Sequence, residues 1–421
     1  MTSVTSLRST ARLLFDAAVQ AADPAAAVLR GFAEAPPPAP TAGGRCIVIA
    51  IGKAAPEMLR EALRLLPKVD DALAVTHHEN DALVPGAEVM RAGHPVPDEA
   101  GALAAARVIE LLQTALATDC IIALISGGGS ALLPAPPPGV SLRDKAKLND
   151  LLLAAGLDIV QMNMIRQQVS QLKGGGFTRL AAPAPVFAYL LSDVIGDDLR
   201  AIASGPTVSP IGTPETAIDL LRTSGIWADV PTSIQAHLER AQKQDTTTVT
   251  KARNTLVGSN SLSLFNMQKA AQNLDLNTTI ENGALTGDVG EAAAAIVAHM
   301  AEVPEPTALL FGGETTVKLS GSGLGGRNQE LALRVAMQAP NLTQDWVFLS
   351  GGTDGRDGPT DAAGGIVDAG TVDRIASSGV EVDALLANND SFAALNAAGD
   401  LLITQATGTN VADVQVLLIT P

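Results

Sequence analysis

Three positively charged residues stand directly beside glycines in this sequence, a placement that suits the binding of an anion. Lys53 and Arg327 each follow a glycine, and Lys173 precedes three of them. Arg327 also opens a helix expected over 327–338, where the helix dipole disfavours a cation. Glycine lets the backbone approach a ligand, so such junctions can grip phosphate oxygens. For any one of them a solvated surface charge is the simpler interpretation, but three in one acidic chain favour anion binding.

A glycine-rich turn, Ser126-Gly127-Gly128-Gly129-Ser130, is a candidate cradle for nucleotide phosphates. It follows the apolar run 120–125, which is typical of a buried strand, and precedes residues that can open a helix. Backbone N–H groups and the positive end of a helix would then face a ligand, for which phosphate is the natural choice. The turn alone fits equally well a tight connection that needs glycine only for steric reasons. A serine hydrolase is disfavoured, because Leu132 replaces the second glycine of G-x-S-x-G.

Aspartates follow two apolar runs, where they could hold Mg²⁺ or accept a proton from a hydroxyl nucleophile. Asp193 follows the run 185–191, and Asp354 follows Ser350-Gly351-Gly352. In open α/β sheets ligands bind beyond the carboxyl ends of the strands, and carboxylates suit both roles there. Asp-Gly pairs are also common turn formers, and we interpret Asp357 in that way.

Three further residues are assigned to ligand binding. His94, held between a glycine and a proline, is singled out among the five histidines as a substrate-binding residue. Gly174, next to Lys173, and Asn260, which follows a strand and Gly258-Ser259, are assigned to the nucleotide.

Common nucleotide-binding signatures are mostly missing. The sequence contains no G-x-x-x-x-G-K-[ST] and no histidine-led catalytic loop of protein kinases. Residues 321–326 do match G-x-G-x-x-G between a strand and a helix. The ribose-binding carboxylate should close the next strand, whereas Asp345 precedes it, which argues against NAD(P).

Composition indicates a globular protein with small partners. Of 421 residues, 47% are hydrophobic, and 28 basic against 44 acidic residues give 28 − 44 = −16. That charge disfavours nucleic acid and anionic membranes as partners. Cys46 and Cys120 both lie in apolar runs, so buried thiols in a reducing compartment are expected. No signal peptide or apolar stretch of about 18 residues is evident, and we expect a soluble, cytoplasmic protein. Oligomeric state stays open, a homodimer included.

Strands and helices alternate along the chain, which predicts a Rossmann-like, doubly wound parallel sheet followed by a second α/β domain. The first domain is predicted over 1–243, and its helices within 1–35 could instead pack on the second. The polar stretch 242–250 is the expected boundary, and the second domain covers 251–421, starting from a strand at 255–257. Further strands are expected in that second half, at 278–280, 308–311, 315–319, 346–350 and 414–420.

Several of these segments together resemble one enzyme family, the class II glycerate 2-kinases with their C-terminal MOFRL domain. The similarity extends from about residue 7 to the end of the chain. It is carried by Gly52-Lys53-Ala54, Gly93-His94-Pro95, Ser126-Gly127-Gly128-Gly129-Ser130, Leu172-Lys173-Gly174-Gly175, Leu191-Ser192-Asp193, Gly325-Gly326-Arg327, Ser350-Gly351-Gly352-Thr353-Asp354-Gly355 and Thr407-Gly408-Thr409-Asn410.

The resemblance implies an enzyme that uses ATP and Mg²⁺ to phosphorylate the 2-hydroxyl of D-glycerate, with its active site in a cleft between the two domains. Lys53 and Arg327 match the family's catalytic lysine and arginine. We assign Asp193 to catalysis and, with Asp354, to the metal, while His94, Arg327 and Asp354 would bind glycerate. The same family is often labelled hydroxypyruvate reductase, so an NAD(P)H-dependent reductase is the alternative. A two-lobed binding protein without catalytic activity is the third option.

Overall fold

The computed structural model describes residues 4–242, 252–300 and 306–420, which form two compact units. The N-terminal unit comprises Ala27–Ser192 and Asp197–Val257, and the C-terminal unit comprises Met1–Ala26, Asp193–Gly196 and Gly258–Pro421. The boundary predicted at 242–250 falls almost entirely outside the described residues. The chain passes between the two units after Ala26, after Ser192, after Gly196 and after Val257.

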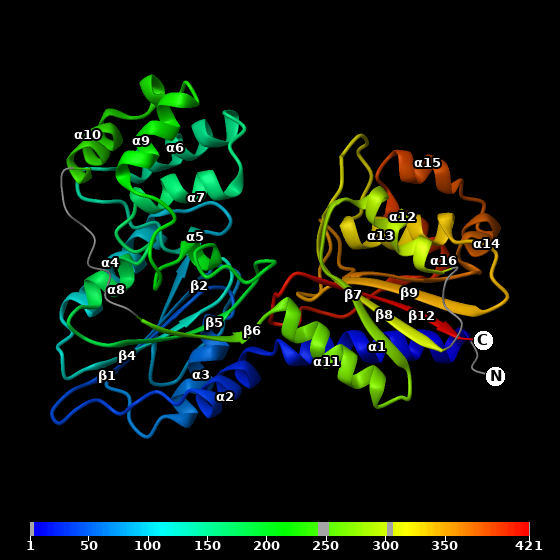
Figure 1. Cartoon of the computed structure of the whole chain (residues 1–421), viewed down its shortest axis with the longest axis horizontal. Coiled ribbons are helices and arrows are strands. Elements are labelled where there is room, and N and C mark those ends of the chain that lie inside the picture. Colours follow the sequence, from blue (N-terminus) through cyan, green and yellow to red (C-terminus); the bar gives the residue numbers. More distant parts are fainter. Residues whose placement is uncertain (1–3, 243–251, 301–305, 421) are drawn as a thin grey trace. The chain divides into compact units, whose positions relative to one another are not determined.

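A six-stranded sheet in the order β3-β2-β1-β4-β5-β6 forms the centre of the N-terminal unit (Figure 1). Its strands are β1 (Cys46–Ile51), β2 (Asp71–His77), β3 (Glu88–Ala92), β4 (Cys120–Ile125), β5 (Val186–Leu191) and β6 (Arg253–Gly258). The pairs β1–β2, β1–β4, β2–β3 and β4–β5 are all parallel. The Rossmann-like expectation is confirmed. The strand expected to open the second half was assigned wrongly, because β6 pairs at the edge of this first sheet.

β1 and β4 lie side by side and are buried along their whole length. Cys46 pairs with Cys120 and Ile51 with Ile125, so the two strands end level with each other. The strand order reverses between them, which makes this edge the switch point where ligands bind in such sheets. Both cysteines are free and buried, and burial raises the pKa of Cys46 to about 11 and that of Cys120 to about 12. Neither thiol is therefore poised to react.

Four helices of the N-terminal unit pack around a core of their own, and we call them the four-helix layer. They are α6 (Leu142–Ala154), α7 (Ile159–Gln168), α9 (Pro214–Thr223) and α10 (Thr232–Ala241). Three of them begin with reciprocal capping boxes at Ser141, Asp158 and Thr213, which satisfy N–H groups of the first turn. Leu152, Ile165 and other apolar side chains form their shared core. The unit's other helices are the C-terminal part of α2 (Pro24–Glu34), α3 (Ala55–Leu65), α4 (Glu99–Gln113), α5 (Gly129–Leu132) and α8 (Gly176–Ala181), with 3₁₀ turns η1 (Ile202–Ser204) and η2 (Trp227–Asp229).

The C-terminal unit contains a mixed six-stranded sheet in the order β11-β10-β9-β12-β8-β7. Its strands are β7 (Asn277–Asp288), β8 (Thr307–Thr316), β9 (Asp345–Gly352), β10 (Gly364–Asp368), β11 (Leu401–Leu402) and β12 (Asp413–Thr420). Within the described residues β7 and β8 run parallel, whereas β12 runs antiparallel to both β8 and β9. The strands expected at 308–311 and 315–319 are replaced by one strand, which continues through Gly312 and Gly313 and ends at Thr316, so residues 317–319 lie outside it. β10, which begins with two glycines, was not predicted.

Helices cover both faces of this second sheet. α1 (Val4–Ala21) and α11 (Asn260–Gln272) pack on one face around Phe15, Leu349 and Val416. The opposite face carries an apolar cluster that includes Leu331 and Phe348 and is covered by α12 (Val289–Met300), α13 (Arg327–Gln338), α14 (Thr371–Ser377), α15 (Val382–Ala387) and α16 (Ser391–Ala398) (Figure 1). No helix in the described part of the chain is long and apolar enough to cross a membrane.

Candidate active site

The loops that follow β1 and β4 are bonded to each other at the switch point. The backbone N–H of Lys53 donates to the carbonyl of Gly127 at 2.9 Å, and the N–H of Ala54 donates to Ser126 Oγ at 3.1 Å. Ser126 is buried, so its hydroxyl serves this connection rather than solvent. The backbone bonds therefore place Lys53 beside the glycine turn.

Gly128 brings three predicted site elements together. Its φ is +84°, and a Cβ added there would lie 3.2 Å from both Lys53 Cγ and His94 Cδ2. Only glycine takes this backbone conformation without strain, and only its missing side chain leaves room for the two neighbours. The lysine and the histidine predicted from sequence thus both border the glycine turn.

His94 lies in a loop whose conformation is stabilised by hydrogen bonds to Asp98. Asp98 Oδ1 accepts from the N–H groups of Gly93 at 3.0 Å and Gly101 at 2.9 Å, and Oδ2 contacts His78 Nε2 at 2.6 Å. Burial opposes ionisation of Asp98, but these hydrogen bonds prevail and lower its pKa to about 2. Burial and the charge of Lys53 lower the pKa of His94, so neutral imidazole is favoured.

Lys173 also reaches the glycine turn. Its Nζ donates to Ser130 Oγ at 2.7 Å, and Ser130 Oγ lies 2.9 Å from Ser204 Oγ. The lysine is only 5% exposed, and burial together with the charges of Lys145 and Arg166 lowers its pKa well below the ordinary value. Gly174, φ +53°, donates its N–H to the Ser204 carbonyl at 3.1 Å, which fixes the backbone next to Lys173.

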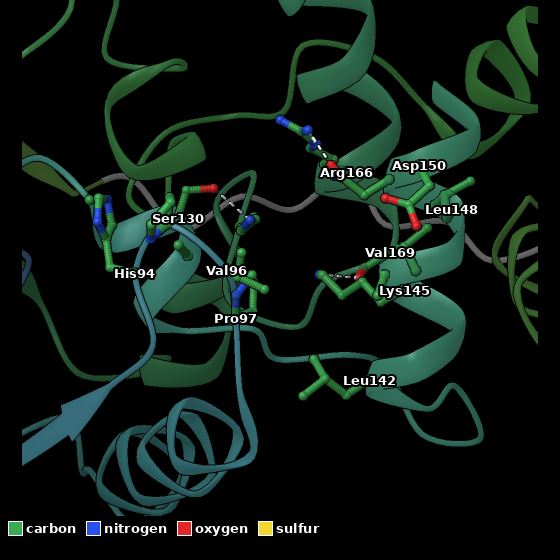
Figure 2. A pocket seen from close by; sticks show the side chains of 16 residues that line it. His94, Val96, Pro97, Ser130, Leu142, Lys145, Leu148, Asp150, Arg166 and Val169 are labelled. Carbon is green, nitrogen blue, oxygen red and sulfur yellow. Dashed lines mark hydrogen bonds between the residues drawn. The ribbon is translucent and has the colours of Figure 1, made fainter. Parts of the chain in front are cut away.

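A cavity of about 420 Å³ connects these residues with the four-helix layer. His94, Gly128, Ser130 and Lys173 line it, as do Lys145 of α6 and Arg166 of α7. Figure 2 shows His94 and Ser130 on one side and Lys145 and Arg166 on the other. Sequence reasoning missed the last two as ligand-binding residues, because neither stands beside a glycine or at the end of a strand.

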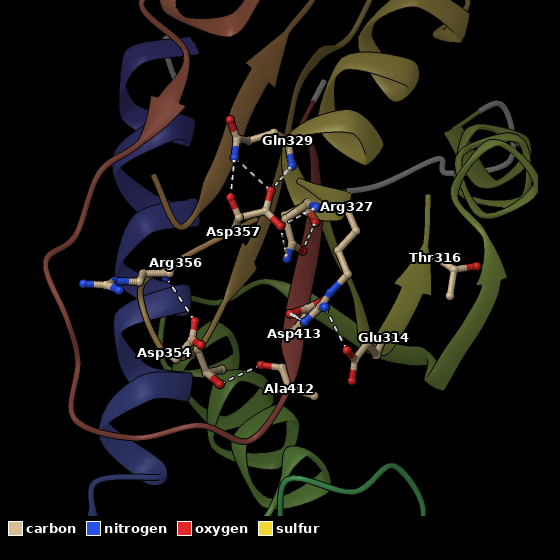
Figure 3. A network of polar contacts seen from close by, with 12 residues as sticks. Glu314, Thr316, Arg327, Gln329, Asp354, Arg356, Asp357, Ala412 and Asp413 are labelled. Carbon is tan, nitrogen blue, oxygen red and sulfur yellow. Dashed lines mark hydrogen bonds and ion pairs between the residues drawn. The ribbon is translucent and has the colours of Figure 1, made fainter. Parts of the chain in front are cut away.

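Arg327 lies in the C-terminal unit and is held by two carboxylates. Its Nε and Nη2 donate to Asp413 at 2.6 and 3.0 Å, and its Nη1 lies 2.7 Å from Glu314 (Figure 3). Burial alone would lower the pKa of Arg327. The hydrogen bonds and the negative charge of Asp413 outweigh the effect of burial, so the pKa of Arg327 lies above its ordinary value. Burial raises the pKa of Asp413 to about 6, against the opposing effect of Arg327.

The G-x-G-x-x-G segment serves packing rather than a dinucleotide. A Cβ at Gly321 would lie 2.3 Å from the Asn388 carbonyl, and one at Gly326 would lie 2.3 Å from Asp357 Cγ. The Asp357 carboxylate already accepts from the first N–H groups of α13, those of Asn328 at 3.1 Å and Gln329 at 2.8 Å. Our interpretation of Asp357 as a simple turn residue was therefore incomplete, since it is buried and caps this helix.

The remaining predicted ligands are partly committed to backbone contacts. Asn260 is buried, and its Nδ2 donates to the carbonyls of Val411 at 2.9 Å and Asp413 at 2.8 Å. Asp354 Oδ1 accepts from the N–H of Arg356 at 3.0 Å (Figure 3). Asp193 lies two residues beyond β5 and is partly buried. Within the described ranges no group of three or more His, Cys, Asp or Glu could hold a metal ion, so metal binding by Asp193 and Asp354 stays a prediction.

A doubly wound sheet with cations and a glycine turn at its switch point is an arrangement suited to an anionic ligand. Comparison with known proteins identifies the class of this α/β protein. Residues 10–239 match the model of a domain of unknown function, DUF4147, and residues 307–413 match the MOFRL family. The glycerate 2-kinase of Pyrococcus horikoshii is 38% identical over 96% of this chain and 95% of its own. The chain therefore belongs to the class II glycerate 2-kinase family.

Of two further similar proteins, one is named as a glycerate kinase and the other carries the family's alternative label. A solved structure of glycerate kinase from Thermotoga maritima superposes with a TM-score of 0.92 at 37% identity, covering 99% of this chain and all of that one. A protein of Agrobacterium vitis named putative hydroxypyruvate reductase is 37% identical over 98% of this chain and 95% of its own.

Proposed function

We propose that this protein transfers the γ-phosphoryl group of ATP to the 2-hydroxyl of D-glycerate and releases 2-phosphoglycerate and ADP. The observation that carries the proposal is the contact of Lys53 and His94 with the glycine turn at the switch point, in a chain of the glycerate 2-kinase family. ATP and glycerate are both anions, so binding them against a net charge of −16 requires cations gathered locally.

Phosphoryl transfer needs positioning and charge stabilisation more than covalent chemistry from the protein. The turn Ser126–Ser130 would cradle the nucleotide phosphates with its backbone, and Lys53 would neutralise charge that develops on the transferring group. No carboxylate in the described part of the chain lies within ion-pair distance of Lys53, and its side chain is partly buried. Its charge is therefore available for substrate.

Arg327 would stabilise the transferring phosphoryl group or bind the glycerate carboxylate. A guanidinium has five N–H donors in a fixed plane, and the contacts to Asp413 and Glu314 use three of them. Asp413 is buried and fixes the plane, whereas the Glu314 side chain is 48% exposed. A substrate carboxylate or phosphate could replace Glu314 without disturbing the pair with Asp413.

Mg²⁺ would arrive with ATP, as part of the substrate. It typically keeps several waters and takes only one or two protein carboxylates besides the phosphates. A pair such as Asp193 and Asp354 would be sufficient for that role. Asp193 could alternatively orient the 2-hydroxyl of glycerate.

Paired assays on the purified protein test this proposal. D-glycerate with Mg²⁺ and ATP should release ADP, and omission of glycerate should stop the release. Hydroxypyruvate with NADH or NADPH should give no change in absorbance, since Asp357 occupies the N-terminus of α13 where a dinucleotide pyrophosphate would lie. Reduction of hydroxypyruvate without ADP release would instead make the protein a reductase.

A further inference from the structure

Lys145, Arg166 and Lys173 line one cavity without a carboxylate partner. Lys145 Nζ donates to the Val169 carbonyl at 2.8 Å, Lys173 Nζ donates to Ser130 Oγ, and Arg166 donates to Asn149 Oδ1. All three acceptors are neutral. Across the residues that the structure describes, no ion pair involves any of the three cations, although the chain has 44 acidic residues.

Gathering like charges in a partly buried cavity is unfavourable for the empty protein. Burial and the neighbouring charge of Arg166 lower the pKa of Lys145 to about 8, and burial also lowers the pKa of Arg166. Asp150 lines the same cavity, but it is exposed and pairs with none of the three. Such an arrangement is compensated once an anion enters and supplies the missing counter-charge.

We propose that Lys145 and Arg166, together with Lys173, bind the polyphosphate chain of the nucleotide, so that the four-helix layer recognises the phosphate donor. This inference rests on the proposed function for the identity of the donor. Lys173 joins the site to the glycine turn through Ser130, while Lys145 and Arg166 approach from α6 and α7 (Figure 2). The phosphates would lie between the turn and the two helices.

Size and charge favour a polyphosphate over glycerate at this position. Three cations match the several negative charges of a di- or triphosphate, whereas glycerate carries a single carboxylate. The cavity of about 420 Å³ also has apolar walls from Leu142, Leu148 and Val169, which give room for the uncharged part of a nucleotide.

Binding measurements on the full-length protein test the site directly. ADP and inorganic tripolyphosphate are titrated calorimetrically into the wild type and into Lys145→Gln and Arg166→Gln. We expect each substitution to weaken both ligands at least tenfold. Lys147→Gln is the matched control, because it removes the same charge from an exposed position on α6 and should change Kd less than twofold. Arg166→Lys, which keeps the charge, should recover part of the affinity and separates loss of charge from misfolding.

Steady-state kinetics separate this inference from the proposed function. If both hold, the two Gln variants raise KM for ATP about tenfold and leave KM for glycerate within twofold. Unchanged binding of ADP and tripolyphosphate in both variants, or a rise in KM for glycerate alone, would overturn the inference while leaving the kinase activity intact. Tight tripolyphosphate binding by a wild type that shows no turnover of glycerate and ATP would support the anion site and contradict the proposed function.

Discussion

The backbone N–H of Lys53 donates to the carbonyl of Gly127 at 2.9 Å, so the loop after β1 is fixed to the turn after β4. The lysine charge and the glycine turn therefore occupy one edge of the sheet as a rigid pair. Both belong to loops at a topological switch point, where the divergence of neighbouring connections leaves room for a ligand.

Lys53→Ala should lower kcat by about 10²- to 10³-fold, because removal of one charge-stabilising group in phosphoryl or acyl transfer costs that much. The fold should persist, since the side chain makes no ion pair within the described residues. Kinetics and a thermal melt check both points. Lys147→Ala serves as the control, and a kcat near that of the wild type in Lys53→Ala would contradict the catalytic role.

Gly128→Ala should impair activity far more than stability. Its positive φ costs an alanine about 1 kcal/mol, and the added methyl would crowd Lys53 and His94. Gly139→Ala is the matched control for Gly128→Ala, because Gly139 has a similar φ of +88° but nothing lies within 4 Å of the added methyl. Denaturant unfolding should give similar losses for both variants, whereas kcat/KM should fall only for Gly128→Ala. Equal activity in the two would argue against a crowded active-site turn.

Affinity for ADP should fall as the pH rises from 7 to 9.5. Lys145 has a pKa of about 8 in the folded protein, below the ordinary value of 10.5, so it loses its charge in this window. The same shift predicts that the ligand-free protein gains stability between about pH 8 and 10.5, because the unfolded chain binds the proton more tightly there. Calorimetric titrations of ADP into the wild type and into Lys145→Arg measure this affinity, which should depend less on pH in the variant. Identical pH dependence in the two proteins would contradict the role of Lys145.

Asp413→Asn should destabilise the C-terminal unit by about 1 to 2 kcal/mol, since it weakens two charge-assisted hydrogen bonds while Arg327 keeps its contact with Glu314. Arg327 would also lose the contact that fixes its guanidinium plane. Urea unfolding measures the first effect, and a raised KM for glycerate or a lowered kcat measures the second. Glu314→Gln, which alters the exposed partner of the same arginine, should cost under 1 kcal/mol. A smaller loss of unfolding free energy for Asp413→Asn than for Glu314→Gln would contradict the view that Asp413 is the main partner of Arg327.

Local sequence patterns were sufficient to predict those strands and loops whose structure depends on residues close together in the sequence. The apolar runs 120–125 and 185–191 predicted β4 and β5 closely, and the glycines beside Lys53 and at 127–129 marked two loops that the structure places at the switch point. A strand that is buried on both faces of a parallel sheet has a continuous apolar sequence, which is why these strands could be predicted.

Long-range contacts account for what the sequence could not reveal. Asp413 meets Arg327 across 86 positions of the chain, and β6 joins the first sheet although a polar stretch precedes it. Lys145 and Arg166 lie on helices with no local sign of a ligand, and only the packing of the four-helix layer brings them to the cavity. The glycines at 321–326 gave a nucleotide-binding signal, yet their spacing is explained by contacts with residues 388–391 and Asp357.

The most direct test identifies the product. Wild-type protein, Mg²⁺, ATP and D-glycerate are combined with enolase but no mutase, and phosphoenolpyruvate is followed by its absorbance. The account predicts formation of phosphoenolpyruvate that depends on glycerate and is reduced at least a hundredfold in Lys53→Ala. ADP release without phosphoenolpyruvate, or equal rates in the wild type and Lys53→Ala, would contradict phosphorylation of the 2-hydroxyl at this site.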